Sequence, residues 1–149
     1  MGAAPGSWLQ VASEAIGEKG LAIGVDLTPI DRVAKNVKTI VGDITDPKTV
    51  EQFSALGPFD AIISDAAPNT SGVKVRDQAQ SAYLIECVLA LAESMLRPGG
   101  AVVMKIFQSS DMPQIQKLMK TQFKKAHIFK PRASRERSFE TYLIGIGKK

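Results

Sequence analysis

Three aspartates in the first half of the chain stand where short apolar runs end. Asp26, Asp43 and Asp65 each lie at or just past a segment with the length and composition of a buried β-strand. Open α/β sheets bind their ligands in the crevice at the carboxyl ends of their strands. One such aspartate is most often a turn or helix-cap residue, but three at successive strand ends favour a binding site.

A glycine-rich turn, residues 2–8, opens directly into a helical pattern. Glycine permits tight turning and close approach of the backbone to a ligand, and a helix N-terminus supplies unpaired N–H groups. Asp26 follows 20 residues after Gly6, and this spacing puts a carboxylate where it can accept both hydroxyls of a ribose. Together these residues indicate a nucleoside-containing cofactor.

The glycine-rich turn differs from the G-x-G-x-x-G sequence that binds a pyrophosphate, because Ala4 and Pro5 occupy its middle. S-adenosylmethionine needs a ribose acceptor, a partner for the adenine amine and room for an amino-acid tail. Asp26, Asp43 and the turn would supply these three features. A nicotinamide-dependent oxidoreductase is an alternative. It is disfavoured by Ala4 and Pro5 in the glycine-rich turn and by the lack of an evident catalytic dyad.

Cysteine and histidine are too few for several kinds of chemistry. Cys87 is the only cysteine and His127 the only histidine, which leaves no internal disulfide, no His/Cys metal site and no suitably spaced catalytic triad. No apolar stretch approaches the roughly 20 residues of a membrane span, and no leader pattern precedes the fold. We therefore expect a cytoplasmic monomer that binds neither a membrane nor a metal ion.

Short apolar runs alternate with helix-length periodic segments, a pattern typical of an α/β fold with a largely parallel sheet. The expected strands are residues 21–25, 39–41, 61–64, 101–107, 126–129 and 141–146. The expected helices are residues 8–16, 47–55, 78–96 and 115–123, the third of them stopped by Pro98-Gly99-Gly100. With no repeat or linker to divide it, the chain is expected to be one domain over residues 1–149.

Five segments resemble motifs of the FtsJ/RrmJ family, in the order and with the spacing of that family. They are GAAPGSW (residues 2–8), SDAAPNTSG (64–72), RPGG (97–100), KIFQ (105–108) and KPRASR with ETY (130–142). The resemblance runs over essentially the whole chain. It implies a Rossmann-like fold with helices on both faces of its sheet, and an S-adenosylmethionine-dependent RNA 2′-O-methyltransferase. The bacterial members modify a uridine in large-subunit ribosomal RNA.

The resemblance also implies roles in cofactor binding. Gly6 and Trp8 would border the methionine end, Asp26 would hold the ribose, Asp43 would lie at the adenine and Asp65 near the methionine moiety.

The catalytic set that the resemblance implies is Lys-Asp-Lys-Glu, of which Asp65, Lys105 and Glu140 are present. The family's first catalytic lysine and its first, central strand would precede Met1. We therefore expect a fold shortened at its N-terminus, which is poorly stable alone or closes its sheet differently.

Lys105 is the candidate general base, but a lysine that carries its positive charge cannot accept a proton. Its ordinary pKa is about 10.4, so burial or a neighbouring cation must lower that pKa before it acts near neutral pH. Asp65 and Glu140 favour the charged form, and we expect them to orient the lysine and the reacting hydroxyl. The alternative for Lys105 is an edge lysine whose amine lies in water.

The basic charge is concentrated in the last third of the chain. Residues 1–104 carry 8 Lys and Arg against 12 Asp and Glu, whereas residues 105–149 carry 11 against 3. Such a surface favours a polyanion, and we expect Lys130, Arg132 and Arg135 to contact RNA. A solvated basic face without a partner is the alternative. For the whole chain, the alternative is a non-catalytic RNA- or cofactor-binding fragment of the same fold.

Overall fold

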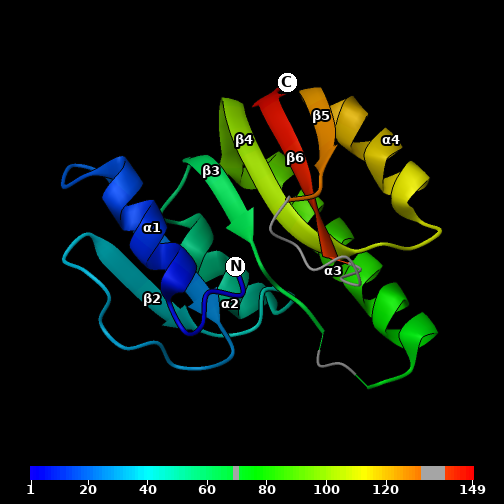
Figure 1. Ribbon diagram of the computed structural model, residues 1–149. Coiled ribbons are helices and arrows are strands. Elements are labelled where there is room, and N and C mark those ends of the chain that lie inside the picture. Colours follow the sequence, from blue (N-terminus) through cyan, green and yellow to red (C-terminus); the bar gives the residue numbers. More distant parts are fainter. Residues whose placement is uncertain (69–70, 132–139) are drawn as a thin grey trace. The chain divides into compact units, whose positions relative to one another are not determined.

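In the computed structural model, which describes residues 1–68, 71–131 and 140–149, the strands form two sheets (Figure 1). The chain divides into two units, Met1–Gly57 and Pro58–Lys149, and each is described here by itself. The expected single domain over residues 1–149 stays a prediction. Within the described part of the chain, no helix is both long and apolar enough to cross a membrane.

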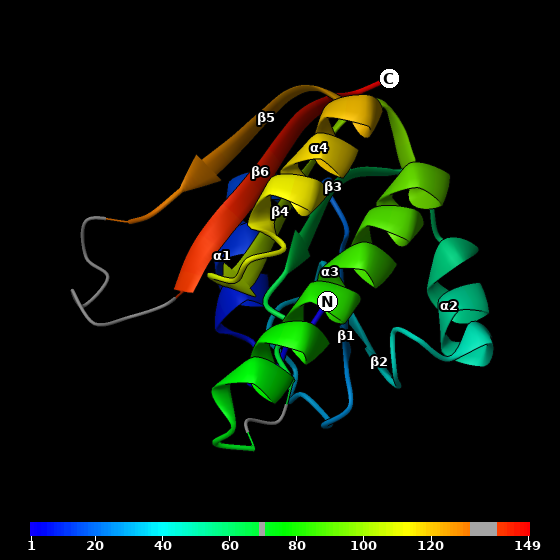
Figure 2. The ribbon, with the colours of Figure 1, turned by 90° about the vertical axis from the view of Figure 1, so that its right-hand side faces the viewer.

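The first unit is built on two parallel strands. Its elements are α1 (Ser7–Ile16), β1 (Ala22–Asp26), β2 (Val37–Val41) and α2 (Pro47–Ser54). Figure 2 shows α1 and α2 on opposite sides of this strand pair. Asp26 ends β1, and Asp43 follows β2. Because the two strands are parallel, both aspartates come to the same end of the small sheet.

Local sequence explains where the helices of the first unit begin and how closely they pack. Gly6 has a φ of 119° directly before α1, a conformation that favours glycine. The Asp46 side chain accepts the Lys48 N–H at the start of α2. A Cβ at Gly24 of β1 would lie 2.5 Å from Leu9 Cδ1, so glycine at this position lets the Leu9 side chain of α1 pack directly on the strand.

The second unit is a four-stranded sheet covered by two helices. Its elements are β3 (Phe59–Ser64), α3 (Lys74–Met95), β4 (Leu96–Phe107), α4 (Met112–Gln122), β5 (Phe123–Phe129) and β6 (Glu140–Lys148). The strand order is β3-β4-β6-β5. Strand β3 is parallel to β4, whereas β6 is antiparallel to both β4 and β5.

The helices of the second unit decide which way the side chains of β4 face. Both α3 and α4 cover the same side of the four-stranded sheet (Figure 2). Val102, Met104 and Ile106 are at most 1% exposed and belong to the core on that side. Because side chains alternate along a strand, Lys105 faces the other side, away from this core.

Two expectations about the elements need correction. The two-stranded sheet is parallel, as expected. The four-stranded sheet is mixed, since both pairings of β6 are antiparallel, and periodicity alone does not reveal strand direction. The third helix begins at Lys74 rather than at residue 78, and it ends at Met95 rather than at residue 96. Arg97 precedes Pro98, and a residue before proline avoids the helical conformation, so the chain enters β4 as soon as the helix ends.

Candidate functional site

The register of β3 on β4 brings Asp65 beside Lys105. Ser64, the last residue of β3, pairs with Met104 of β4. The residues that follow them, Asp65 and Lys105, therefore lie side by side. Lys105 Nζ lies 2.5 Å from Asp65 Oδ1, which makes a close ion pair. Their side chains are only 16% and 27% exposed, so the alternative of an edge lysine with its amine in water does not hold.

Glu140 reaches the same lysine from the other neighbouring strand. Lys105 pairs with Tyr142 and Phe107 pairs with Glu140, which makes Glu140 the diagonal neighbour of Lys105 on one face of the sheet. Glu140 Oε1 lies 3.4 Å from Lys105 Nζ, and the Glu140 side chain is 44% exposed. Asp65 is therefore the stronger partner of the lysine, and Glu140 the weaker one.

The surroundings of Lys105 raise its pKa above the ordinary value. Burial disfavours the ammonium, but the hydrogen bond and charge of Asp65, together with those of Glu140, outweigh that effect. The expectation that the two carboxylates favour the charged form is confirmed. At neutral pH the site therefore holds an ammonium group whose position is fixed between two carboxylates.

Asp26 in the first unit is fixed by the glycine-rich turn. Its Oδ2 accepts the Ala4 N–H at 2.8 Å, and its Oδ1 accepts the Thr28 N–H at 2.8 Å. Each carboxylate oxygen has two lone pairs, so these two bonds leave acceptor capacity on both oxygens. The Ala3 N–H also donates to the Val25 carbonyl, which holds the turn against the end of β1.

Asp43 lies near Asp26, as the sequence indicates. The Gly42 N–H donates to the Asp26 carbonyl at 2.8 Å, which ties the end of β2 to the end of β1. Asp43 Oδ1 accepts both the N–H and the hydroxyl of Thr45, each at 2.8 Å. A Cβ on Gly42 would lie 2.4 Å from Thr49 Oγ1, so glycine allows this turn to pack on α2.

Comparison with known proteins identifies the family. The model of the FtsJ-like methyltransferase family matches residues 1–148. The chain belongs to this family.

Curated relatives of this family cover almost the whole chain. The ribosomal RNA large subunit methyltransferase E of Syntrophobacter fumaroxidans is 45% identical over 148 residues, which is 98% of this chain and 75% of that protein. The protein of the same name from Anaeromyxobacter sp. (strain Fw109-5) is 43% identical over 150 residues. The chain covers 54% of the length of that relative.

Solved structures confirm the fold class. A structure described as a ribosomal RNA methyltransferase from Plasmodium falciparum has a TM-score of 0.86 and 27% identity, and the match covers 99% of this chain and 83% of that one. Human methyltransferase-like protein 13, at 13% identity and a TM-score of 0.67, matches over 95% of this chain and 68% of its own. The chain has the Rossmann-like α/β fold of this class of methyltransferases.

The structure sorts the residues implied by the family resemblance into two groups. Lys105, Asp65 and Glu140 meet in the second unit. In the first unit, Gly42, the residue before Asp43, bonds to the Asp26 carbonyl. Gly6 is buried and Trp8 is half-buried, both at the start of α1. Arg132 and Arg135 lie outside the described residues, and Lys130 is exposed just after β5. The described residues contain no group of three or more His, Cys, Asp or Glu side chains arranged to hold a metal ion.

Two polar residues near the catalytic candidates were missed from the sequence. Ser81 is 2% exposed on α3 and Asp77 is 9% exposed in the first turn of that helix. The available signal for Ser81 is its place in the apolar stripe that continues through Ile85 and Val88. A polar residue buried in such a stripe needs a hydrogen-bond partner, so the pattern indicates that the Ser81 hydroxyl bonds to another group in the core.

Proposed function

We propose that this chain carries out S-adenosylmethionine-dependent methylation of a ribose 2′-hydroxyl in large-subunit ribosomal RNA, at a uridine. The observation that carries the proposal is the lysine held between two carboxylates at the ends of β3, β4 and β6 in a member of the FtsJ-like methyltransferase family. Such a group is suited to hold a hydroxyl, and after it has lost a proton it can receive the proton of that hydroxyl.

The residues of the first unit fit the proposed cofactor. Asp26 keeps acceptor capacity on both carboxylate oxygens, as the two hydroxyls of a ribose require. The bonds that Asp43 accepts from Thr45 both use Oδ1, so we assign the adenine amine to its Oδ2. Gly6 and Trp8 at the start of α1 are assigned to the methionine end, and Asp65 to the methionine moiety. When bound, S-adenosylmethionine supplies an electrophilic methyl carbon on a sulfonium.

Lys105 has two tasks in the proposed reaction. As an ammonium it donates a hydrogen bond to the 2′-oxygen and holds that oxygen in line for attack. Once the ammonium has lost a proton to water, the neutral amine would accept the 2′-hydroxyl proton at Nζ while the oxygen–carbon bond forms and the carbon–sulfur bond of the methyl donor breaks. The raised pKa of Lys105 favours the ammonium. A cation brought close to Nζ would lower that pKa, because two like charges disfavour each other.

Asp65 and Glu140 are proposed to orient Lys105 in this reaction. Asp65 Oδ1, 2.5 Å from Lys105 Nζ, accepts one N–H of the ammonium and so holds the lysine at the end of β3. Glu140, at 3.4 Å and partly exposed, fixes a second direction and can also accept the hydroxyl hydrogen bond of a bound ribose.

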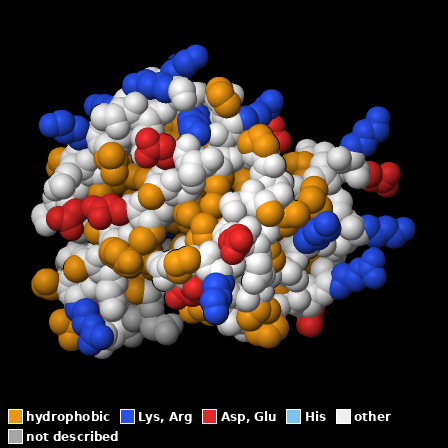
Figure 3. Space-filling model, turned by 180° about the vertical axis from the view of Figure 1, so that it is seen from behind, with side chains coloured by type: hydrophobic (Ala, Val, Ile, Leu, Met, Phe, Trp, Pro, Cys, Tyr) orange, Lys and Arg blue, Asp and Glu red, His pale blue; other side chains and the backbone are white. Residues whose placement is uncertain are grey.

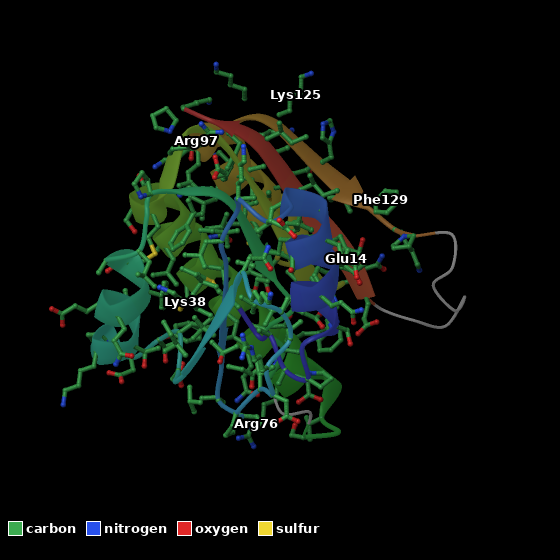
Figure 4. All side chains as sticks on the ribbon, turned by 90° about the vertical axis from the view of Figure 1, so that its left-hand side faces the viewer. Glu14, Lys38, Arg76, Arg97, Lys125 and Phe129 are labelled. Carbon is green, nitrogen blue, oxygen red and sulfur yellow. The ribbon has the colours of Figure 1, made fainter. Side chains whose placement is uncertain are left out.

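The proposed RNA surface includes strand β5. Lys124 and Lys125 are exposed on this strand, and Lys130 follows it. Phe129 is 52% exposed, and Figure 4 shows Lys125 and Phe129 on the outer side of β5. Cations beside an exposed ring suit a single strand, since the cations contact phosphates and a base stacks on the ring. Arg132 and Arg135 continue the proposed surface in sequence.

The face drawn in Figure 3 carries charges of both signs. Several Lys and Arg side chains gather along the upper margin of the face drawn in Figure 3, and Asp and Glu side chains are scattered over the rest of it. Acidic side chains repel phosphates, so a mixed surface attracts RNA less strongly than a basic one does.

A methyl-transfer assay on large ribosomal subunits from methylation-deficient cells tests the proposal. Radiolabelled S-adenosylmethionine reports transfer, and resistance of the product to alkaline cleavage locates the methyl group on the 2′-oxygen. We expect Lys105→Ala to abolish transfer while cofactor binding by calorimetry stays within about twofold. Lys117→Ala, at an exposed position of α4, is the matched control.

The outcomes separate the proposed functions. Transfer by Lys105→Ala at the wild-type rate would show that the base is assigned wrongly. Binding of S-adenosylmethionine by the wild-type chain without any turnover would favour the non-catalytic RNA- or cofactor-binding function. Methyl groups found on a nucleobase would contradict the 2′-O assignment.

A further inference from the structure

The N-terminal turns of α3 hold three polar side chains whose partners lie in other segments of the second unit. They are Asp77, Gln78 and Ser81, and the first and third are nearly buried. Their partners are the segment that leads into α3 and the end of β4. The end of β4 carries Lys105.

Ser81 and Gln78 hold the end of β4. Strand β3 ends opposite Met104, but β4 continues to Phe107, so its last residues lack a β3 partner on that side. The Phe107 N–H donates to Ser81 Oγ at 3.3 Å. Gln78 Nε2 donates to the Gln108 carbonyl at 2.6 Å. The segment just after Lys105 is thus fastened to the helix.

Asp77 holds the other segment. Its Oδ1 accepts the Ser71 N–H at 2.8 Å and the Ser71 hydroxyl at 2.7 Å. These hydrogen bonds lower the pKa of Asp77, so the carboxylate is charged at neutral pH. Ser71 lies six residues after Asp65, on the same connection between β3 and α3.

We propose that Ser81 and Gln78 are positioning residues for Lys105, which keep the end of β4 where the lysine reaches Asp65. This inference rests on the proposed function. Lys105 is only two residues from Phe107, and Phe107 is also the register partner of Glu140. Fraying of this strand end would therefore move the lysine and loosen its second carboxylate together.

The expected effect is on turnover rather than on binding. A displacement of about 1 Å can cost up to about 100-fold in rate, and loss of one anchoring hydrogen bond is expected to lower kcat about 10-fold. The KM values for RNA and S-adenosylmethionine should stay within about twofold, because neither Ser81 nor Gln78 is proposed to contact them.

Ser81→Ala is the direct test, and Ser94→Ala is its matched control. Ser94 lies near the other end of α3, and its hydroxyl donates to the Ala90 and Leu91 carbonyls of the same helix. We expect Ser81→Ala to lower kcat and to speed hydrogen exchange at the Phe107 amide about 10-fold, while Ser94→Ala changes neither. Ser81→Thr, which keeps the hydroxyl, should restore both.

A second pair of variants covers the case in which Ser81→Ala does not fold. Gln78→Met keeps the shape of the side chain but removes its N–H donor, and Gln80→Met is a control at an exposed position two residues along. We expect a smaller fall in kcat for Gln78→Met, about threefold, and none for Gln80→Met.

Titration of Lys105 Nζ by NMR keeps the inference separate from the proposed function. In Ser81→Ala the pKa of Lys105 should fall toward its ordinary value, because the lysine spends less time beside Asp65. If the wild-type chain transfers no methyl group, the proposed function fails, and the titration and hydrogen exchange still decide the positioning role. An unchanged Lys105 titration, or an unchanged kcat in an active enzyme, would overturn the inference.

Discussion

The ion pair between Lys105 and Asp65 should contribute measurably to the stability of the second unit. At 2.5 Å, two unit charges attract by roughly 1.7 kcal/mol with the screening of water, and by roughly 6.6 kcal/mol at an effective dielectric constant of 20. Both side chains are less than a third exposed, so the pair lies between a surface pair and a buried one. Desolvation of the two groups offsets much of the attraction. We expect a coupling energy of about 1–3 kcal/mol.

A double-mutant cycle measures this coupling. The variants Asp65→Asn, Lys105→Met and the double substitution are unfolded in urea at neutral pH, together with the wild type. Asparagine and methionine keep the side-chain sizes while removing the charges. If the two single effects add to the double effect within about 0.5 kcal/mol, the pair contributes nothing net and the electrostatic reasoning is refuted.

The contribution of the Lys105–Asp65 ion pair to stability should depend on pH. The folded state raises the pKa of Lys105, so it binds the proton more tightly than the unfolded chain does. The contribution is therefore fully present below the unfolded pKa of about 10.4, and it is lost as pH rises through the folded pKa. The coupling energy measured in the cycle should shrink over this alkaline range. A coupling that stays constant there would show that it does not come from the lysine charge.

Three further predictions follow from the same geometry. The kcat for methyl transfer should rise from neutral to alkaline pH as Lys105 loses its proton. Asp65→Asn should move this rise to lower pH, because Asp65 raises the pKa of Lys105. If the rise does not move, it belongs to the titration of another group. Glu140→Gln should lower the transfer rate less than Asp65→Asn does, about two- to fivefold, because Glu140 is farther away and 44% exposed; equal rates for the two variants would contradict this order. Gly145→Ala should destabilise the chain by about 1–3 kcal/mol in urea unfolding, because its Cβ would lie 2.8 Å from two ring carbons of Phe123.

Much of the element pattern could be predicted from the sequence, because strands in this fold are short apolar runs separated by turn residues. The expected strand at residues 61–64 lies within β3, and the expected helix at residues 8–16 is α1 less its first residue. The start of α3 was not predictable from apolar periodicity, since Val75 in its first turn is 76% exposed. The direction of β6 depends on how the chain returns to the sheet, which the periodicity of its side chains does not record.

The candidate site was predictable in its residue types but not in its geometry. Asp65, Lys105 and Glu140 came from the motifs of a family resemblance, whereas the distances between them depend on two strand registers. The apolar stripe on α3 marks Ser81 as buried, but its partner is a backbone N–H of β4, and the side-chain pattern does not reveal that partner. Polar groups that hold a site in place leave a weaker trace in the sequence than the charged groups that act there.

The two carboxylates that fix Lys105 also oppose its use as a base. Moving Asp65 away would make the amine easier to deprotonate, but it would also release the lysine from the position in which it can meet a hydroxyl. A cation arriving beside the lysine resolves this conflict, because it lowers the pKa of Lys105 without breaking either carboxylate contact. The charge of the methyl donor and any further lysine at the site would act in this direction. Basicity would then appear only in the loaded enzyme, so titration of Lys105 with and without bound S-adenosylmethionine should give a lower pKa in its presence.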